Sequence, residues 1–541
     1  MTRLAENRPR RPPVRFLVLL GVLVLGAYLR WTPRVLVEDL RPWPDAIEYE
    51  EAARSLAEGR GYLLWIADRG YPPRYPPGLS LLIAASTPLV GTAPGCGIWV
   101  VLASALAAIV GTYVLASSAA GPVAGVVAAL LVATSPVHVR WSHSVMSDLP
   151  ASAALVWLAA WIVSLLQRRA GALEHAALGL ACGLAVSIRQ PLVVLAATAC
   201  IAVALVGGTG RERARNTGVL AAGVLLGVLP LFCLNAELFG HPLRNGYGYW
   251  TAGRMFSLRD AAARPSGEPS NVWYYGSLFV GGGSLYPWPS AVLLLIGTLA
   301  ALRRPGAART LALVSWLLTL LLVGLHVAYF ARGSRLILPI VPPLAAVMAV
   351  PFAAGSRGWL RALAVTLVAA TLLLERAHPE GFTPADPPLH DTATLEKIAA
   401  IAEPNAAILV RTNPFSFARV LRRDADRVWV PLRLDAHQAA IEHQKLLPVR
   451  RDAVDGGWIG TPLRMPFNRA AALATVEELC RSGRPVYLSE GLRPLVPFMS
   501  KLKRALRTRF KLTQVVKPRP YSVYRIECAA QRRAPASAPS A

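Results

Sequence analysis

Long apolar runs alternate with short polar segments along most of the chain. An α-helix that crosses a bilayer core of roughly 30 Å requires about 17 to 25 predominantly apolar residues. Runs of this kind recur from Phe16 to about Glu375. The pattern predicts a mainly α-helical protein, with a polytopic bundle of transmembrane helices over residues 1–376.

The pattern changes after about residue 376. Short apolar runs then alternate with helical stretches, which is typical of a soluble α/β domain. The runs are 407–410, 428–430 and 486–488. We therefore expect a second domain over residues 377–528, and a disordered tail over residues 529–541, which are rich in Ala, Pro and Ser.

Composition supports a membrane protein, and the cysteines add one detail. Of 541 residues, 54% are hydrophobic and only 16% are charged. Four of the six cysteines lie in apolar runs, where they are expected to be small core residues. Cys480 and Cys528 both lie in the second domain, and a disulfide between them is an option if that domain faces an oxidising compartment.

The basic residues orient the chain. The formal net charge is +26, but many arginines lie in short loops beside apolar runs, where they keep a loop on the cytoplasmic side. The charge is therefore a topology signal and does not indicate nucleic acid as a partner. The basic loops are the N-terminal segment and residues 168–169, 211–215, 303–309 and 357–361. We expect a multi-pass protein of the bacterial inner membrane, with a cytoplasmic N-terminus and an extracytoplasmic second domain.

About eleven crossings follow from this orientation, because the two ends of the bundle must lie on opposite sides. The chain must cross the membrane an even number of times over the three runs 76–90, 96–117 and 122–137. One of the three is therefore expected to be short, tilted or re-entrant.

The first outside loop carries the most informative pattern. Residues 43–62 combine acidic residues with apolar positions spaced by three and four, which predicts a short amphipathic helix at the membrane interface. Asp45 stands at its start, where a carboxylate caps free backbone N–H groups. A plain helix cap is the alternative interpretation of Asp45.

This loop resembles the start of the GT-C glycosyltransferases. The resemblance is to the family that contains protein O-mannosyltransferases and lipid A aminoarabinose transferases, a glycosyltransferase family 39-like pattern. The matching positions are Asp45, Tyr49, Ala52, Leu56, Gly59, Gly61, Tyr75 to Gly78, Ser147 to Pro150, Arg335 to Pro339, and Pro342-Pro343.

Such a family implies a polyprenyl-phosphate sugar donor and a carboxylate in the first outside loop near the acceptor. Asp45 is the matching position. Two departures leave the sugar and the acceptor open. The acidic residue that follows in the protein mannosyltransferases is Ala46 here, and a Glu-Lys pair common in the aminoarabinose group appears as Arg74-Tyr75.

The expected chemistry requires a base and several cations. A hydroxyl that attacks an anomeric carbon loses a proton, while the departing phosphate gains negative charge. Asp45 is the candidate general base, with Glu48 as the carboxylate that would replace it. Asp148 is a second catalytic candidate, which could orient the acceptor or bind a divalent cation, although a helix cap is again the alternative.

The candidate groups for the donor phosphate lie on the outside face. Guanidinium groups bind phosphate oxygens through paired donors. Interfacial arginines also extend towards lipid headgroups without a further role. The candidates are Arg74 with its neighbour Tyr75, and Arg189, Arg332 and Arg335. Arg189 has no charged neighbour and stands between two apolar runs.

The sequence therefore predicts a membrane glycosyltransferase that moves a sugar from a polyprenyl phosphate to a lipid, glycan or protein hydroxyl on the extracytoplasmic face. A transporter or flippase of a lipid-linked or anionic substrate is the alternative, although such proteins usually show two similar halves. No cofactor is assigned beyond a divalent cation as an option. His138 and His143, which flank Trp141, are more typical of interfacial packing than of a metal site.

Overall fold

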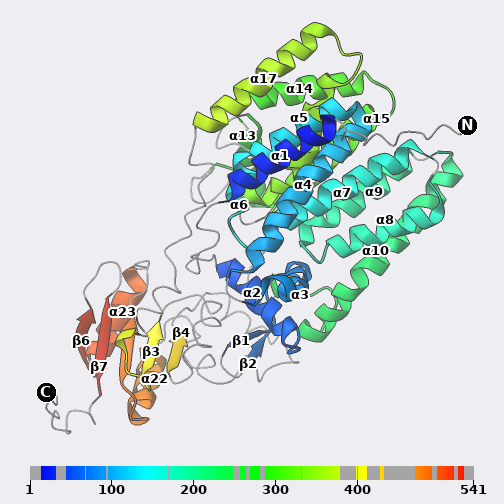
Figure 1. Cartoon of the computed structure of the whole chain (residues 1–541). Helices are drawn as coiled ribbons and strands as arrows, with labels where there is room; N and C mark the ends of the chain where they lie inside the picture. Colours follow the sequence, from blue (N-terminus) through cyan, green and yellow to red (C-terminus); the bar gives the residue numbers. More distant parts are fainter. Residues whose placement is uncertain are drawn as a thin grey trace, which may run out of the picture.

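The computed structural model shows a bundle of helices from α1 to α17 and a small sheet formed by the C-terminal part of the chain (Figure 1). The structure describes residues 14–31, 44–66, 69–92, 95–168, 170–206, 208–247, 256, 258–262, 269–280, 287–329, 332–377, 398, 400–410, 427–431, 469–489, 496–516 and 522–528. The predicted tail over residues 529–541 lies outside these ranges.

The helices of the bundle follow the apolar runs. Among the described residues, six segments are long and apolar enough to cross a membrane. They are α4 (Gly97–Ala120), α7 (Asp148–Gln167), α10 (Gly210–Phe239), α15 (Ala307–Val327), α17 (Gly358–Ala377) and the continuous run of η3 (Ser334–Ile340), α16 (Val341–Met348) and η4 (Val350–Phe352).

Shorter helices pack between these long segments. The apolar ones include α1 (Val14–Arg30), α5 (Pro122–Thr134), α8 (Ala172–Ala185), α9 (Val193–Val206) and α14 (Trp288–Leu302). The mainly helical membrane architecture that the sequence predicts is confirmed. The total of eleven crossings stays a prediction, as does the side of each terminus.

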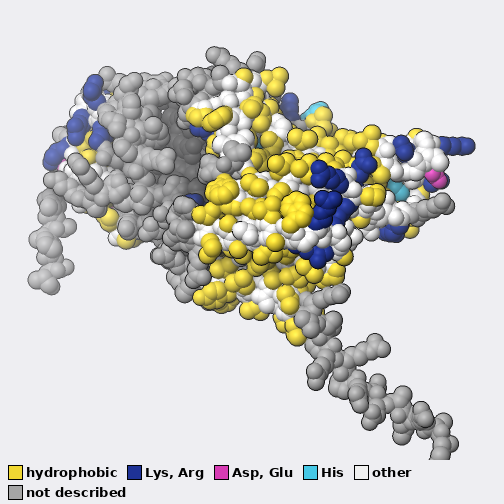
Figure 2. All heavy atoms as spheres, turned by 90° about the horizontal axis from the view of Figure 1, so that it is seen from above, with side chains coloured by type: hydrophobic (Ala, Val, Ile, Leu, Met, Phe, Trp, Pro, Cys, Tyr) yellow, Lys and Arg dark blue, Asp and Glu magenta, His cyan; other side chains and the backbone are white. Residues whose placement is uncertain are grey.

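The outer surface of the bundle suits a bilayer. Figure 2 shows hydrophobic side chains over much of the described part of the bundle, with Lys and Arg side chains gathered towards one end. On α10, Leu225, Leu226 and Leu229 are 67%, 62% and 51% exposed. Apolar side chains exposed in this number are costly in water and favourable in lipid.

The helix α3 (Gly78–Val90) does not cross the bundle. Glu48 of α2 (Pro44–Ala57) accepts a hydrogen bond from the backbone N–H of Arg74, just before α3. Glu50, also on α2, accepts one from the N–H of Gly97, just after α3, at 3.2 Å. Both ends of α3 therefore lie beside α2. Thirteen residues of helix also span only about 20 Å, so α3 is shorter than a bilayer core of roughly 30 Å requires.

A close backbone contact fixes the start of α3. The N–H of Gly78 donates to the carbonyl of Ser187 at 2.6 Å. A Cβ atom at Gly78 would lie 2.6 Å from backbone atoms of Ser187 and Ile188, a distance that no larger residue tolerates. Glycine at this position therefore brings the segment before α3 against the turn that carries Arg189.

The C-terminal part of the chain forms a five-stranded sheet in the order β4-β3-β5-β7-β6. The first three are parallel to one another, and β7 runs antiparallel to both of its neighbours. The strands are β3 (Ala407–Val410), β4 (Val428–Pro431), β5 (Val486–Ser489), β6 (Lys511–Val516) and β7 (Val523–Glu527). The three apolar runs named in the sequence are thus strands. That this region is a separate soluble domain over 377–528 stays a prediction.

Two helices and a disulfide complete this region. Buried side chains of α22 (Arg469–Arg481) and α23 (Val496–Arg507) join the core of the sheet, among them Val476, Leu502 and Leu506. Cys480 and Cys528 are joined by a disulfide, with their Cα atoms 5.5 Å apart. The disulfide that the sequence left as an option is therefore present, and it suits an oxidising compartment.

Candidate functional site

Asp45 lies between two arginines that come from distant parts of the chain. It occupies the first turn of α2, where Pro44 suits the helix start and a carboxylate faces the positive end of the helix dipole. Its Oδ1 is 3.0 Å from an Nη of Arg74, and its Oδ2 is 3.2 Å from an Nη of Arg335. Asp45, Arg74 and Arg335 are 17%, 22% and 29% exposed. The two cations therefore meet on one carboxylate that solvent still reaches.

Glu48 supports the same arrangement from one turn further along α2. Its carboxylate accepts hydrogen bonds from the backbone N–H groups of Arg74 and Tyr75, and it lies 3.4 Å from an Nη of Arg74. Glu48 is 1% exposed. It therefore holds the segment that carries Arg74 in place, and its own carboxylate is shielded from solvent.

The two neighbouring carboxylates differ in acidity. Burial opposes ionisation of Asp45, but the positive charges of Arg74 and Arg335 outweigh it and lower the pKa of Asp45. Burial raises the pKa of Glu48 to about 7, and Arg74 only partly offsets this. Asp45 is thus ionised over the whole physiological range, whereas Glu48 titrates near neutrality.

Three tyrosine rings pack behind this cluster. Tyr49 and Tyr75 stack with their ring centroids 4.7 Å apart, and Tyr247 meets Tyr75 edge-on at 5.5 Å. The hydroxyl of Tyr49 donates to Ser147 Oγ at 3.0 Å, directly before Asp148. The rings therefore connect the first loop to the start of α7.

Asp148 forms a second, more enclosed pair with Arg189. Its Oδ1 is 2.5 Å from Arg189 Nη1, and the two side chains are 5% and 11% exposed. Asp148 is also in the first turn of α7. It therefore has a charge partner as well as the helix-start position that the sequence offered as its alternative interpretation.

The remaining candidate arginines lie in different surroundings. Arg335, in η3, donates to the sulfur of Met146 at 3.7 Å and places its guanidinium 5.2 Å from the ring centre of Trp141. Arg332 donates to the carbonyl of Pro269 at 2.9 Å and lies over the ring of Tyr274. The structure thus brings Arg335 onto Asp45 and holds Arg332 against the segment that contains α13 (Asn271–Val280).

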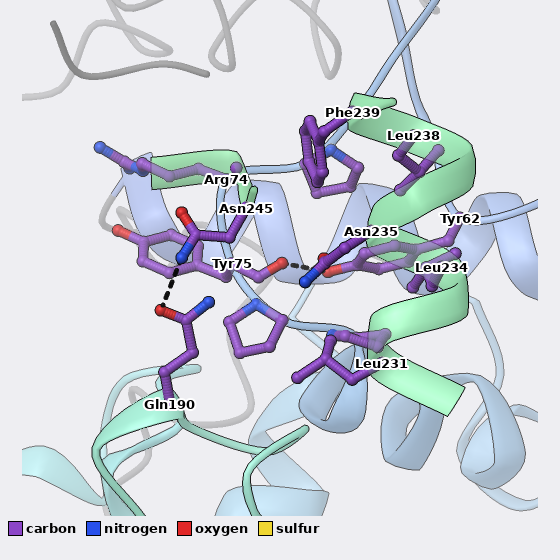
Figure 3. Close-up of a pocket in the computed structure, with 14 residues that line it drawn as sticks. Tyr62, Arg74, Tyr75, Gln190, Leu231, Leu234, Asn235, Leu238, Phe239 and Asn245 are labelled. Carbon is purple, nitrogen blue, oxygen red and sulfur yellow. Dashed lines mark hydrogen bonds between the residues drawn. The ribbon is translucent and has the colours of Figure 1, made fainter. Parts of the chain in front are cut away.

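A small pocket opens beside Arg74, with about 250 Å³ of empty space (Figure 3). One wall is the end of α10, and the other is the segment 73–77. Three carboxamides line it: Gln190, Asn235 and Asn245. The amide of Asn245 donates to Gln190 at 3.3 Å, and the hydroxyl of Tyr62 donates to the carbonyl of Tyr75 at 2.9 Å. The lining thus combines amides, aromatic rings and the side chain of Arg74.

The predicted site residues thus fall into three groups. One is the cluster of Asp45, Glu48, Arg74, Tyr75 and Arg335, a second is the pair of Asp148 and Arg189, and Arg332 stands apart. Their catalytic and phosphate-binding roles stay predictions. Tyr247, Gln190 and Asn245 were not singled out as a group, since their proximity to Tyr75 depends on how α10 and the following loop pack.

The described residues do not contain a group of three or more His, Cys, Asp or Glu side chains placed as metal ligands. Asp45, Glu48 and Asp148 each have an arginine partner within this part of the chain.

Comparison with known proteins gives one family match and several structural ones. Residues 74–234 match the family model of dolichyl-phosphate-mannose-protein mannosyltransferases. Two crystal structures of ArnT from Cupriavidus metallidurans, apo and bound to undecaprenyl phosphate, superpose with TM-scores of 0.61 and 0.60, at 15% and 16% identity. In both cases the match covers 94% of this chain and 97% of the other. The chain has the GT-C glycosyltransferase fold.

More distant proteins share the GT-C fold. The archaeal oligosaccharyltransferase AglB from Archaeoglobus fulgidus, in complex with an inhibitory peptide and a dolichol-phosphate, matches 97% of this chain and 75% of its own, at 12% identity and a TM-score of 0.53. No curated protein matches the chain by sequence. The family match and the GT-C fold, both of which belong to membrane glycosyltransferases, confirm the resemblance noted in the sequence.

Proposed function

We propose that the protein transfers a sugar from a polyprenyl-phosphate donor to an acceptor hydroxyl at the extracytoplasmic face of the bacterial inner membrane. The observation that carries the proposal is the carboxylate of Asp45 held between Arg74 and Arg335 at a solvent-accessible edge of the bundle. A base and two cations in one place match what this reaction needs. The ArnT structure with undecaprenyl phosphate supports a donor of this class.

The reaction assigns a role to each of these groups. The acceptor oxygen attacks the anomeric carbon and forms the new glycosidic bond, while its proton passes to Asp45. The bond between the anomeric carbon and the phosphate oxygen breaks, and the polyprenyl phosphate leaves with the electron pair. The guanidinium groups of Arg74 and Arg335, which both lie at Asp45, stabilise the charge on the departing phosphate.

The other predicted residues take supporting roles in the proposal. Glu48 and Tyr75 hold Arg74 in place through the backbone and through the ring, over which the guanidinium lies at 4.6 Å. Arg189 and Arg332 add positive potential on the same side of the bundle. Asp148 orients the acceptor indirectly, through Ser147 and Tyr49. The acceptor is a lipid, glycan or protein hydroxyl.

A deletion strain tests the proposal. Its envelope glycans and glycolipids are compared by mass spectrometry after complementation with wild-type protein or with Asp45→Asn at equal expression. One sugar modification should be lost on deletion, be restored by the wild type and stay absent with Asp45→Asn. If neither deletion nor any site variant altered a glycan, the transporter interpretation would replace this one.

A further inference from the structure

A buried arginine lies outside the site, and among the residues that the structure describes no carboxylate forms an ion pair with it. Arg30, the last residue of α1, is fully buried and is among the largest fully buried side chains of the described residues. Its Nη1 donates to the carbonyls of Gly26 at 2.9 Å and Ala133 at 2.8 Å. Its Nη2 donates to the carbonyl of Val132 at 3.2 Å. An uncompensated charge in this position is costly and calls for a function.

The sequence explains why these carbonyls are available. α5 ends at Thr134, and Pro136 follows, which has no N–H to donate back to the last turn. The carbonyl of Val132 accepts instead a long bond from the N–H of Ser135 at 3.4 Å, and the carbonyls of Val132 and Ala133 both lie at the negative end of the α5 dipole, where they can accept further donors. The guanidinium of Arg30 caps this end from another helix.

The fourth acceptor of Arg30 is a histidine. Its Nη2 lies 2.9 Å from Nδ1 of His138 in α6 (Pro136–Trp141). Because arginine can only donate, Nδ1 carries no proton, and the neutral ring has its proton on Nε2. That nitrogen lies 3.5 Å from Ser152 Oγ. Ser152 is one helical turn after Asp148 on α7, so α1, α5, α6 and α7 are joined just behind the site.

The segment from α6 to the start of α7 carries several contacts of the site. Trp141 and Met146 both touch Arg335, Ser147 accepts from Tyr49, and Asp148 binds Arg189. α6 also packs against η3, which contains Arg335. A shift of α6 would therefore move the surface on which Arg335 rests, and with it one of the two cations on Asp45.

We propose that Arg30 and His138 are positioning residues of the glycosyltransferase site, which hold α6 so that Trp141 and Met146 keep Arg335 on Asp45. Neither residue touches the substrate. The inference rests on the proposed function, because it assigns their purpose through Arg335 and Asp45. Misplacement of a reacting group by about 1 Å costs up to roughly 10²-fold in rate.

Substitutions at His138 separate positioning from general stability. His138→Leu removes the acceptor for Arg30. His138→Asn restores it, since Asn Oδ1 takes the place of Nδ1, whereas His138→Gln reaches towards Ser152 instead. His175→Leu is the matched control, because this buried histidine bonds the carbonyl of Gly171, just before α8. It lies beyond the end of α7 that is far from Asp148.

The assay uses the full-length protein in nanodiscs, with polyprenyl-phosphate sugars extracted from native membranes as the donor mixture. Turnover per folded protein and KM are measured, together with the binding of undecaprenyl phosphate alone. His138→Leu and His138→Gln should lose about tenfold or more in kcat with little change in KM. His138→Asn should recover most of kcat, and His175→Leu should keep it even where its Tm falls.

Two outcomes would overturn the inference. One is a His138→Leu enzyme with wild-type turnover per folded molecule, and the other is equal loss in the Asn, Gln and Leu variants in proportion to their Tm. Asp45→Asn in the same assay keeps the two proposals distinguishable. If it abolishes transfer while His138→Leu does not, the site stands and the positioning role fails. If Asp45→Asn transfers normally, the proposed site itself is wrong.

Discussion

Two carboxylates begin helices on the same side of the bundle, yet their surroundings differ. Asp45 is shared by two arginines and is 17% exposed, whereas Asp148 is bound by one arginine at 2.5 Å and is 5% exposed. A carboxylate that solvent reaches and that two arginines share can exchange partners when a substrate arrives. A carboxylate in a buried ion pair cannot exchange partners without leaving its arginine as an unpaired buried charge. The comparison therefore assigns the chemical role to Asp45 and a structural role to Asp148.

The largest effect on stability is expected when the buried ion pair is broken. Asp148→Asn leaves the charge of Arg189 buried without a counter-ion, which costs about 3 to 5 kcal/mol. Thermal unfolding of the purified protein should show a clearly lower Tm, and the double variant Asp148→Asn with Arg189→Gln should recover part of it. Unchanged Tm in the single variant would contradict the distinction drawn between the two carboxylates.

The arginines of the two arrangements should differ in donor binding. Loss of a charge-assisted hydrogen bond costs about 1.5 to 3 kcal/mol, or roughly tenfold or more in affinity. Arg74→Gln should therefore weaken binding of undecaprenyl phosphate in nanodiscs by about this factor. Arg189→Gln should act mainly on Tm. A larger affinity loss for Arg189→Gln would move the phosphate site to the second pair, as its isolated position in the sequence also allows.

The smallest effect concerns the pH dependence at Glu48. Its pKa is raised by burial to about 7 in the folded protein, against an ordinary value near 4.3 for an exposed glutamate. Between these values the folded state binds the proton that the unfolded state has lost, so stability falls as the pH rises through this window. The Tm of Glu48→Gln minus that of the wild type should therefore increase from pH 5 to pH 8. A difference that does not change with pH would show that Glu48 does not titrate there.

Local sequence pattern was sufficient to mark four residues of the candidate site. Asp45, Glu48, Arg74 and Tyr75 lie within one stretch of the sequence, where helix periodicity and a proline motif mark the loop. Arg335 was named because of its motif, but its contact with Asp45 could not be foreseen, because the two residues are 290 positions apart. The packing of helices, and no local pattern, brings them together.

The same reasoning explains what the sequence did not reveal. Arg30 was simply the end of the first apolar run, and His138 was expected to be an ordinary interfacial residue. Their hydrogen bond joins positions 108 apart, so it depends on how α1 packs against α5 and α6. Counting crossings left open which of the runs 76–90, 96–117 and 122–137 is short, and the contact of α3 with α2 at both ends required the fold.

The most direct measurement of the central claim is sugar transfer by purified Asp45→Asn. The amide keeps the size and much of the capping ability of Asp45, and Arg74 and Arg335 are partly exposed, so Tm should fall less than in Asp148→Asn and undecaprenyl phosphate should still bind. The amide cannot accept the proton of the acceptor, and transfer should fall by about 10² to 10⁴. Transfer at the wild-type rate by a correctly folded Asp45→Asn enzyme would contradict the account and leave Glu48 or Asp148 as the base.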